Sequence, residues 1–195
     1  KAENKKILLF ENMEPTIDKS KINLECGMPA GFVNQQMIEQ VKNSMVRIKC
    51  SRKYGTGAFI YFPYKERKIT CIITNEHVIS IDDVDNGETI TLEPYVGGTY
   101  SLTLEKTERY IKSFKSIDSY DCTIIEVFDS DPLPDDLEFL EVDANYLNTE
   151  FYLFKPFILY QFPEESQGEL KIAQGFINKK YNLSLRSVVP CKGAS

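Results

Sequence analysis

The sequence contains a single histidine, His77, followed along the chain by Asp121 and Ser195, two residue types that can work with an imidazole. A serine hydroxyl becomes a nucleophile when an imidazole takes its proton and an acid holds that imidazole in the correct tautomer. Gly193 precedes Ser195 by two positions, so the chain can turn there and aim the amides of Gly193 and Ser195 at one developing oxyanion. These residues predict nucleophilic acyl-transfer chemistry with His77 as the base.

Each of these residues also has a plain structural interpretation. A lone histidine beside an apolar strand is more often a structural residue, and a serine at a chain end can belong to a frayed terminus. Asp118 and Asp121 are both suited to a turn before a strand, and the apolar run that follows Asp121 favours it over Asp118 as the acid. Cys191 is a possible thiol nucleophile, but it lacks the glycine geometry around Ser195, so we assign it to a pocket wall.

Composition excludes several classes of protein. The 195 residues include 42% hydrophobic and 27% charged residues, the balance of a globular chain with a core. The 23 basic and 29 acidic residues give a net charge of −6, which argues against nucleic-acid binding through a broad basic face. The apolar runs are too short to span a bilayer, so no membrane association is expected.

Cysteine usage bears on the compartment and on metals. The five cysteines are an odd number without a C-x-x-C pair, which is unlike the disulfide framework of a small secreted protein. An intracellular location, in cytoplasm or nucleus, is therefore favoured over secretion. With one histidine and no cysteine cluster, neither a zinc site nor any cofactor is expected.

The spacing of apolar residues predicts strands after one short helix. Residues 1–32 are interpreted as an extension, and Val33, Met37, Val41 and Met45 recur at helical spacing behind a possible cap at Asn34. From residue 46 the period changes to two, as expected for half-buried strands. The first set of predicted strands is 46–50, 58–62, 69–73, 89–92, 100–104, 109–114 and 122–127.

An acidic, proline-bearing segment at 129–136 is the best internal boundary, and a solvated linker explains it better than a calcium site. Further strands are predicted at 151–154, 157–162, 170–177 and 183–189. We therefore predict an all-β protein with a helix and a first barrel in 33–130 and a partial second barrel in 131–195.

Three short motifs resemble the chymotrypsin-fold (trypsin-like) serine proteases, in particular their intracellular or HtrA-like branch. They are Gly55-Thr56-Gly57-Ala58-Phe59-Ile60, then Thr74-Asn75-x-His77-Val78-Ile79 and Asp121-x-Thr123-Ile124-Ile125, followed by Gly193-Ala194-Ser195 at the start of a nucleophile loop. The resemblance covers roughly residues 38 to 195. Gly-Thr-Gly with Thr-Asn-x-His-Val is its most specific part.

The resemblance implies two six-stranded-type antiparallel barrels and a catalytic set of His77, Asp121 and Ser195, with the amides of Gly193 and Ser195 in the oxyanion hole. It also implies a substrate pocket at Val189, Cys191 and Lys192, with Val189 at its floor. Because an apolar floor does not compensate a buried cation, we expect preference for an apolar or aromatic residue before the scissile bond.

The expected function is hydrolysis of peptide bonds in a peptide or protein substrate. The family continues after the serine, so we expect the 195-residue chain alone to be inactive, and its second half to be partly disordered or completed by its own carboxy-terminal segment as a separate chain. A protease-like binding or scaffold module without turnover is the alternative from a different functional class.

Overall fold

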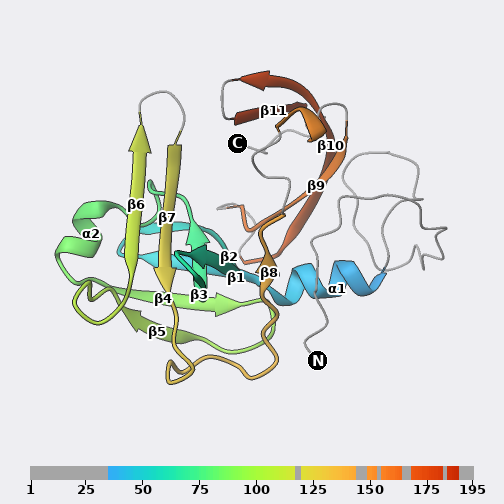
Figure 1. Cartoon of the computed structure of the whole chain (residues 1–195). Coiled ribbons are helices and arrows are strands. Elements are labelled where there is room, and N and C mark those ends of the chain that lie inside the picture. Colours follow the sequence, from blue (N-terminus) through green and yellow to red (C-terminus); the bar gives the residue numbers. More distant parts are fainter. Residues whose placement is uncertain are drawn as a thin grey trace. The chain divides into compact units, whose positions relative to one another are not determined.

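The computed structural model describes residues 35–116, 120–143, 149–152, 155–163, 168–181 and 184–188. In chain order the elements are α1 (Gln35–Asn43), β1 (Met45–Cys50), β2 (Lys53–Tyr64), β3 (Arg67–Thr74), α2 (Ile81–Asp85), β4 (Thr89–Pro94), β5 (Tyr100–Thr103), β6 (Ile111–Ser116), β7 (Tyr120–Glu126), β8 (Leu140–Glu141), the 3-10 helix η2 (Thr149–Tyr152), β9 (Pro156–Gln161), β10 (Lys171–Tyr181) and β11 (Ser184–Val188). Figure 1 labels the α-helices and the strands. The chain divides into two compact units. Gln40–Val142 belongs to the first, and the described residues of 35–39 and 143–188 belong to the second.

The first unit contains an eight-stranded sheet in the order β5-β4-β1-β2-β3-β7-β6, with β8 paired to β2. All the pairs along this order are antiparallel, and β8 alone joins in parallel. In β1 the side chains of Val46, Ile48 and Cys50 are buried, whereas Arg47 and Lys49 are not. This is the period-two alternation of a strand with one face on a core.

A large hydrophobic core lies inside this sheet, and a smaller cluster forms around Ile60 and Cys71. The large core includes Leu102 of β5 and Ile111 of β6, which stand at the two ends of the strand order, together with Ile48, Phe59 and Leu92 from the strands between them. Because strands from both ends contribute to the same cluster, the sheet curls around a shared interior as a half-barrel. Burial of these side chains is the main favourable term for forming the unit.

The second unit contains a three-stranded antiparallel sheet in the order β11-β10-β9. In this sheet Lys171 pairs with Gln161 at one end of β9 and Phe176 pairs with Pro156 at the other. The all-β class predicted from the sequence is confirmed, and the second sheet is an incomplete barrel.

A predicted strand and the end of the predicted helix differ from the structure. The strand predicted at 151–154 is wrong for Phe151 and Tyr152, which close the 3-10 helix η2 with their rings 5.3 Å apart in an edge-on arrangement. A short aromatic run carries no periodicity that separates a strand from a single helical turn. The predicted helix spacing also extends to Met45, which instead begins β1.

The acidic segment after His77 forms a helix as well as a turn. Ser80 caps α2, and a capping box is complete because the Ser80 hydroxyl accepts from the backbone of Asp83 while the Asp83 carboxylate accepts from the backbone of Ser80. Acidic residues in the first turn of a helix also interact favourably with its dipole. The residues of 82–87, rich in Asp, Asn and Gly, also suit a turn, but α2 occupies the first part of this segment, and Gly87 follows with a positive φ of 63°.

Candidate active site

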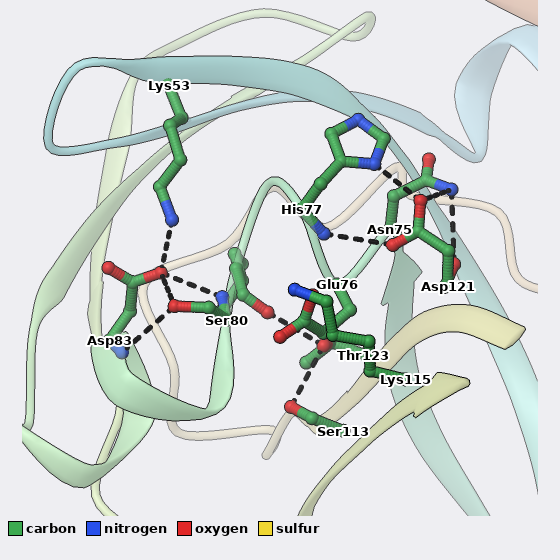
Figure 2. Close-up of polar contacts among 11 residues, drawn as sticks. Lys53, Asn75, Glu76, His77, Ser80, Asp83, Ser113, Lys115, Asp121 and Thr123 are labelled. Carbon is green, nitrogen blue, oxygen red and sulfur yellow. Dashed lines mark hydrogen bonds and ion pairs between the residues drawn. The ribbon is translucent and has the colours of Figure 1, made fainter. Parts of the chain in front are cut away.

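His77 and Asp121 lie in contact, although they come from different parts of the chain. His77 belongs to the turn between β3 and α2, and Asp121 is the second residue of β7. The His77 Nδ1 atom lies 2.5 Å from Asp121 Oδ2, and the His77 backbone N–H donates to Asp121 Oδ1 at 2.9 Å (Figure 2). One carboxylate thus holds both the ring and the backbone of His77.

Asn75 adds a third connection to the same aspartate. Its side-chain amide donates to the Asp121 carbonyl oxygen at 3.1 Å and lies 3.4 Å from Oδ2. Burial acts to raise the pKa of the Asp121 carboxyl, but the hydrogen bonds and charge of His77 outweigh it and lower that pKa below its usual range. Asp121 is therefore a carboxylate at neutral pH. The sequence motif includes Asn75 but does not reveal this role.

The turn that carries His77 is anchored by the two apolar residues after it. Val78 and Ile79 are fully buried, and their backbone N–H groups both donate to the Asn75 carbonyl oxygen at 3.2 Å. A Cβ placed on Gly55 would stand 2.2 Å from a Val78 methyl carbon, so a larger residue at position 55 of β2 would displace the turn. Gly55, the first glycine of the Gly-Thr-Gly motif, thus leaves room for the turn. This is a physical reason for a glycine at that position of the motif.

A polar side chain in β7 fixes the far end of the turn. Thr123 is fully buried, and its hydroxyl donates to the Ile79 carbonyl oxygen at 2.8 Å. The Ser113 hydroxyl of β6 lies 2.9 Å from the same Thr123 oxygen. Asp121 and Thr123 therefore hold the beginning and the end of one turn from one strand.

Lys53 stabilises the start of α2, directly after this turn. Its ammonium lies 2.5 Å from Asp83 Oδ2, the oxygen that also accepts from the Ser80 hydroxyl and backbone N–H (Figure 2). Burial acts to raise the pKa of Asp83, but these donors outweigh it and lower that pKa. The cap of α2 is thus part of an ion-paired cluster, and this cluster holds the chain directly after the turn that carries His77.

The His77–Asp121 pair is exposed to solvent in the described part of the chain. The His77 side chain is 67% exposed and that of Asp121 is 44% exposed. Because Nδ1 is occupied by the carboxylate, Nε2 is the ring atom that can take a proton from another group. The arrangement is suited to general base catalysis at Nε2.

The remaining predicted site residues are not placed. Ser195, Gly193, Val189, Cys191 and Lys192 lie outside the described residues, and so does the alternative acid Asp118.

The described cysteines do not provide an activated thiol. Cys50, Cys71 and Cys122 are free thiols, the first two fully buried and the third partly buried. Burial raises the pKa of Cys50 to about 11 and that of Cys71 to about 12, and it raises the pKa of Cys122 as well. These thiols stay protonated at neutral pH and are poor nucleophiles.

The described ranges offer neither a metal-binding group nor a membrane-spanning helix. Residues 35–116 and the later described segments contain no group of three or more His, Cys, Asp and Glu side chains that could hold a metal ion. Among the same segments, no helix has the length and apolar character needed to cross a membrane.

Comparison with solved structures finds similarity to a protease. The Rv3671c protease in its inactive form matches with a TM-score of 0.47 and 18% identity, covering 75% of this chain and 58% of that chain. A serine-to-alanine mutant of Rv3671c from M. tuberculosis H37Rv, also in an inactive form, matches with a TM-score of 0.46 and 18% identity over 75% of this chain and 56% of that one. The chain therefore spans less than two thirds of the length of these proteins. No protein-family model matches the sequence, and no curated protein matches it significantly.

Proposed function

We propose that this protein is a serine endopeptidase that cleaves peptide bonds through an acyl-enzyme. The observation that carries the proposal is the contact between His77 and Asp121, in which one carboxylate accepts from the backbone N–H of His77 and lies 2.5 Å from Nδ1. An imidazole that is oriented in this way, with Nε2 available, is the base that a serine nucleophile requires. The HtrA-like branch and an intracellular location are also part of the proposal.

In the proposed reaction Ser195 attacks the scissile carbonyl carbon while His77 Nε2 takes the hydroxyl proton. Asp121 keeps the proton of the neutral ring on Nδ1 and stabilises the imidazolium that forms. The amides of Gly193 and Ser195 donate to the oxyanion. His77 then gives its proton to the leaving amine, and a water activated by His77 releases the acyl group from Ser195.

Substrate preference is proposed from the residues just before the nucleophile. Val189 would form the floor of the pocket, with Cys191 and Lys192 beside it. An apolar floor leaves a buried Lys or Arg side chain without a counter-charge, so an apolar or aromatic side chain before the scissile bond is favoured. A peptide-library profile dominated by Lys or Arg at that position would contradict this part of the proposal.

Covalent labelling of the full-length protein with a fluorophosphonate tests the proposal directly. Labelling is expected for the unmodified protein and is expected to disappear in Ser195→Ala, because the hydroxyl is the labelled group. His77→Ala should slow labelling strongly, because the base is lost. Ser101→Ala removes an exposed hydroxyl from β5 and is the matched control, which should label normally.

Labelling that persists in Ser195→Ala would overturn the assignment of the nucleophile. A correctly folded full-length protein that neither labels nor cleaves peptides would instead favour the alternative function, a protease-like binding module. An NMR spectrum in which the His77 ring signal still reports contact with Asp121 would show that the site is folded. A lack of labelling would then mean a lack of catalysis and not a loss of structure.

A further inference from the structure

A buried carboxylate stands next to His77 in the sequence. The Glu76 side chain is only 3% exposed, and its Oε2 atom lies 2.9 Å from the Lys115 ammonium of β6. Lys115 itself is 72% exposed. An ionised carboxylate at this depth requires a counter-charge, and Lys115 supplies it (Figure 2).

The strand register places Lys115 beside the predicted catalytic acid. In the antiparallel pair of β6 and β7, Lys115 and Asp121 are direct cross-strand partners. Direct partners point to the same face of a sheet, with their Cβ atoms about 5 Å apart. Two adjacent residues of the turn, Glu76 and His77, therefore contact two adjacent side chains of the β6–β7 pair.

We propose that Glu76 and Lys115 are positioning residues that hold the His77 ring on Asp121. The proposal rests on the proposed function for its catalytic meaning, but the geometry that it concerns is independent of catalysis. The Glu76–Lys115 contact ties the backbone immediately before His77 to β6, while Asp121 ties His77 to β7. Because two separate contacts hold the turn, it cannot rotate about one of them without breaking the other.

The charges around Lys115 all act in one direction. Glu76 contributes the most, through its close ion pair with Lys115, and Asp121 of β7 and Asp82 of α2 add to it, so that the pKa of Lys115 is raised above its usual value. Lys115 is thus a cation throughout the range in which a histidine titrates. Its charge also sits close to Asp121 and supports the ionised state of that acid.

Loss of the lysine has a clear physical consequence. Glu76 would become a buried charge without a counter-ion, and it would recover solvation by moving toward water. Because Glu76 and His77 are consecutive residues, that movement would pull the ring away from Asp121. The neutral imidazole would then populate both tautomers, with the proton on Nδ1 in some molecules and on Nε2 in others, instead of mainly the Nδ1–H form.

The single histidine makes this measurable without any assay of activity. Ring ¹⁵N shifts of the histidine-labelled protein report the ratio of the Nδ1–H tautomer to the Nε2–H tautomer for His77 alone. We expect Nδ1–H to dominate in the unmodified protein and the ratio to fall by about three-fold or more in Lys115→Met, the scale of one partly exposed charge contact. Lys115→Arg should restore the ratio, because it keeps the cation.

Lys112→Met is the matched control, since it removes an exposed lysine from the same strand and should leave the ratio unchanged. The double variant Glu76→Gln/Lys115→Met removes both charges, so it avoids a stranded carboxylate and should fold even if Lys115→Met does not. It is also expected to lower the ratio, because the tie to β6 is gone.

An unchanged ratio in a folded Lys115→Met or in the double variant would overturn the proposal, as would an equal fall in Lys112→Met. If the protein is also shown to be a peptidase, kcat should fall with the ratio while KM changes little. The tautomer ratio stays informative if the protein is not a peptidase, so failure of the proposed function and failure of this inference are distinguishable.

Discussion

Two aspartates near the two ends of β7 make similar bonds. Asp121, near its start, accepts from the backbone N–H of His77 and contacts the ring nitrogen. Asp131, in the loop that follows β7, accepts from the Arg109 guanidinium at 2.9 and 3.0 Å and from the Phe128 backbone N–H at 2.7 Å. In both carboxyls burial acts to raise the pKa, and hydrogen bonds outweigh it and lower the pKa.

Exposure and the nature of the partner separate the two pairs. The side chains of Arg109 and Asp131 are 8% and 9% exposed, whereas those of His77 and Asp121 are 67% and 44% exposed. Arg109 cannot release its proton, and its position among buried groups fixes the loop after β7. A histidine ring, unlike a guanidinium, can both accept and donate a proton during a reaction. The same type of bond thus serves structure at one end of the strand and is available for chemistry at the other.

The largest expected effect is on activity, at the exposed pair. If the protein is the proposed peptidase, Asp121→Asn should lower its kcat by about 10⁴-fold, because the amide favours the wrong tautomer of His77. The free energy of unfolding should change by about 1 kcal/mol or less, because both partners are largely solvated. Peptide hydrolysis and urea unfolding, measured on one preparation, check the two statements.

Asp129→Asn is the matched control, since Asp129 is an exposed acid that follows the same strand. It should leave both quantities unchanged. If Asp121→Asn greatly lowered the free energy of unfolding but preserved the activity per folded molecule, Asp121 would serve structure and not chemistry. That result would contradict the comparison.

The second effect is on stability, at the buried pair. Arg109→Met should lower the free energy of unfolding by about 3–5 kcal/mol, because Asp131 is left as a buried charge without its partner. Arg109 also packs 4.9 Å over the Phe128 ring and donates to the Glu126 carbonyl oxygen, and both contacts are lost as well. Urea unfolding at neutral pH measures the change. A loss below about 1 kcal/mol would show that burial does not distinguish this pair from a surface pair.

Local patterns in the sequence predicted much of the first sheet. The alternation of Val46, Ile48 and Cys50 indicated β1 with the correct face buried, because a strand with one face on a core must repeat every two residues. The motifs around His77 and Asp121 predicted that these two residues act together, and the structure brings them into contact.

The ion pairs were not predictable in the same way. Arg109–Asp131 and Glu76–Lys115 join residues on different elements, and only the strand register and the depth of burial reveal them. Many exposed acids and bases could pair equally well on the basis of a single sequence. The α2 helix was missed for a related reason, since its cap depends on a bond between Ser80 and Asp83 in residues that also suit a turn.

The third effect concerns acid stability. The folded pKa of Asp131 lies below its unfolded value of about 3.9, so its contribution is complete well above that value and is lost as pH falls through the folded pKa. The difference in unfolding free energy between the unmodified protein and Asp131→Asn should therefore narrow below about pH 4, by at most about 1.4 kcal/mol per pH unit, the limit for one proton.

Denaturant unfolding at several pH values measures this difference. Asp83 and Asp121 also have lowered pKa values, but they are present in both proteins, so their contributions cancel. A difference that stays constant from about pH 7 to about pH 2.5, or that widens in acid, would contradict the expected direction of the change.

The smallest effect is expected at an exposed ion pair in the same sheet. Lys68 of β3 lies 2.7 Å from Glu141 of β8, a good distance for an ion pair, but the Lys68 side chain is 60% exposed. Water and salt screen such a pair, and holding a long side chain costs entropy, so Lys68→Met should change the free energy of unfolding by less than about 1 kcal/mol. It introduces the same residue as Arg109→Met and also removes one cation, but Arg109→Met breaks a buried pair and in addition loses the contacts with Phe128 and the Glu126 carbonyl oxygen. Urea unfolding at low and at high salt should show that the small effect of Lys68→Met shrinks with salt while the large effect of Arg109→Met does not. Equal losses in the two variants would mean that distance, rather than burial, sets the value of an ion pair in this fold.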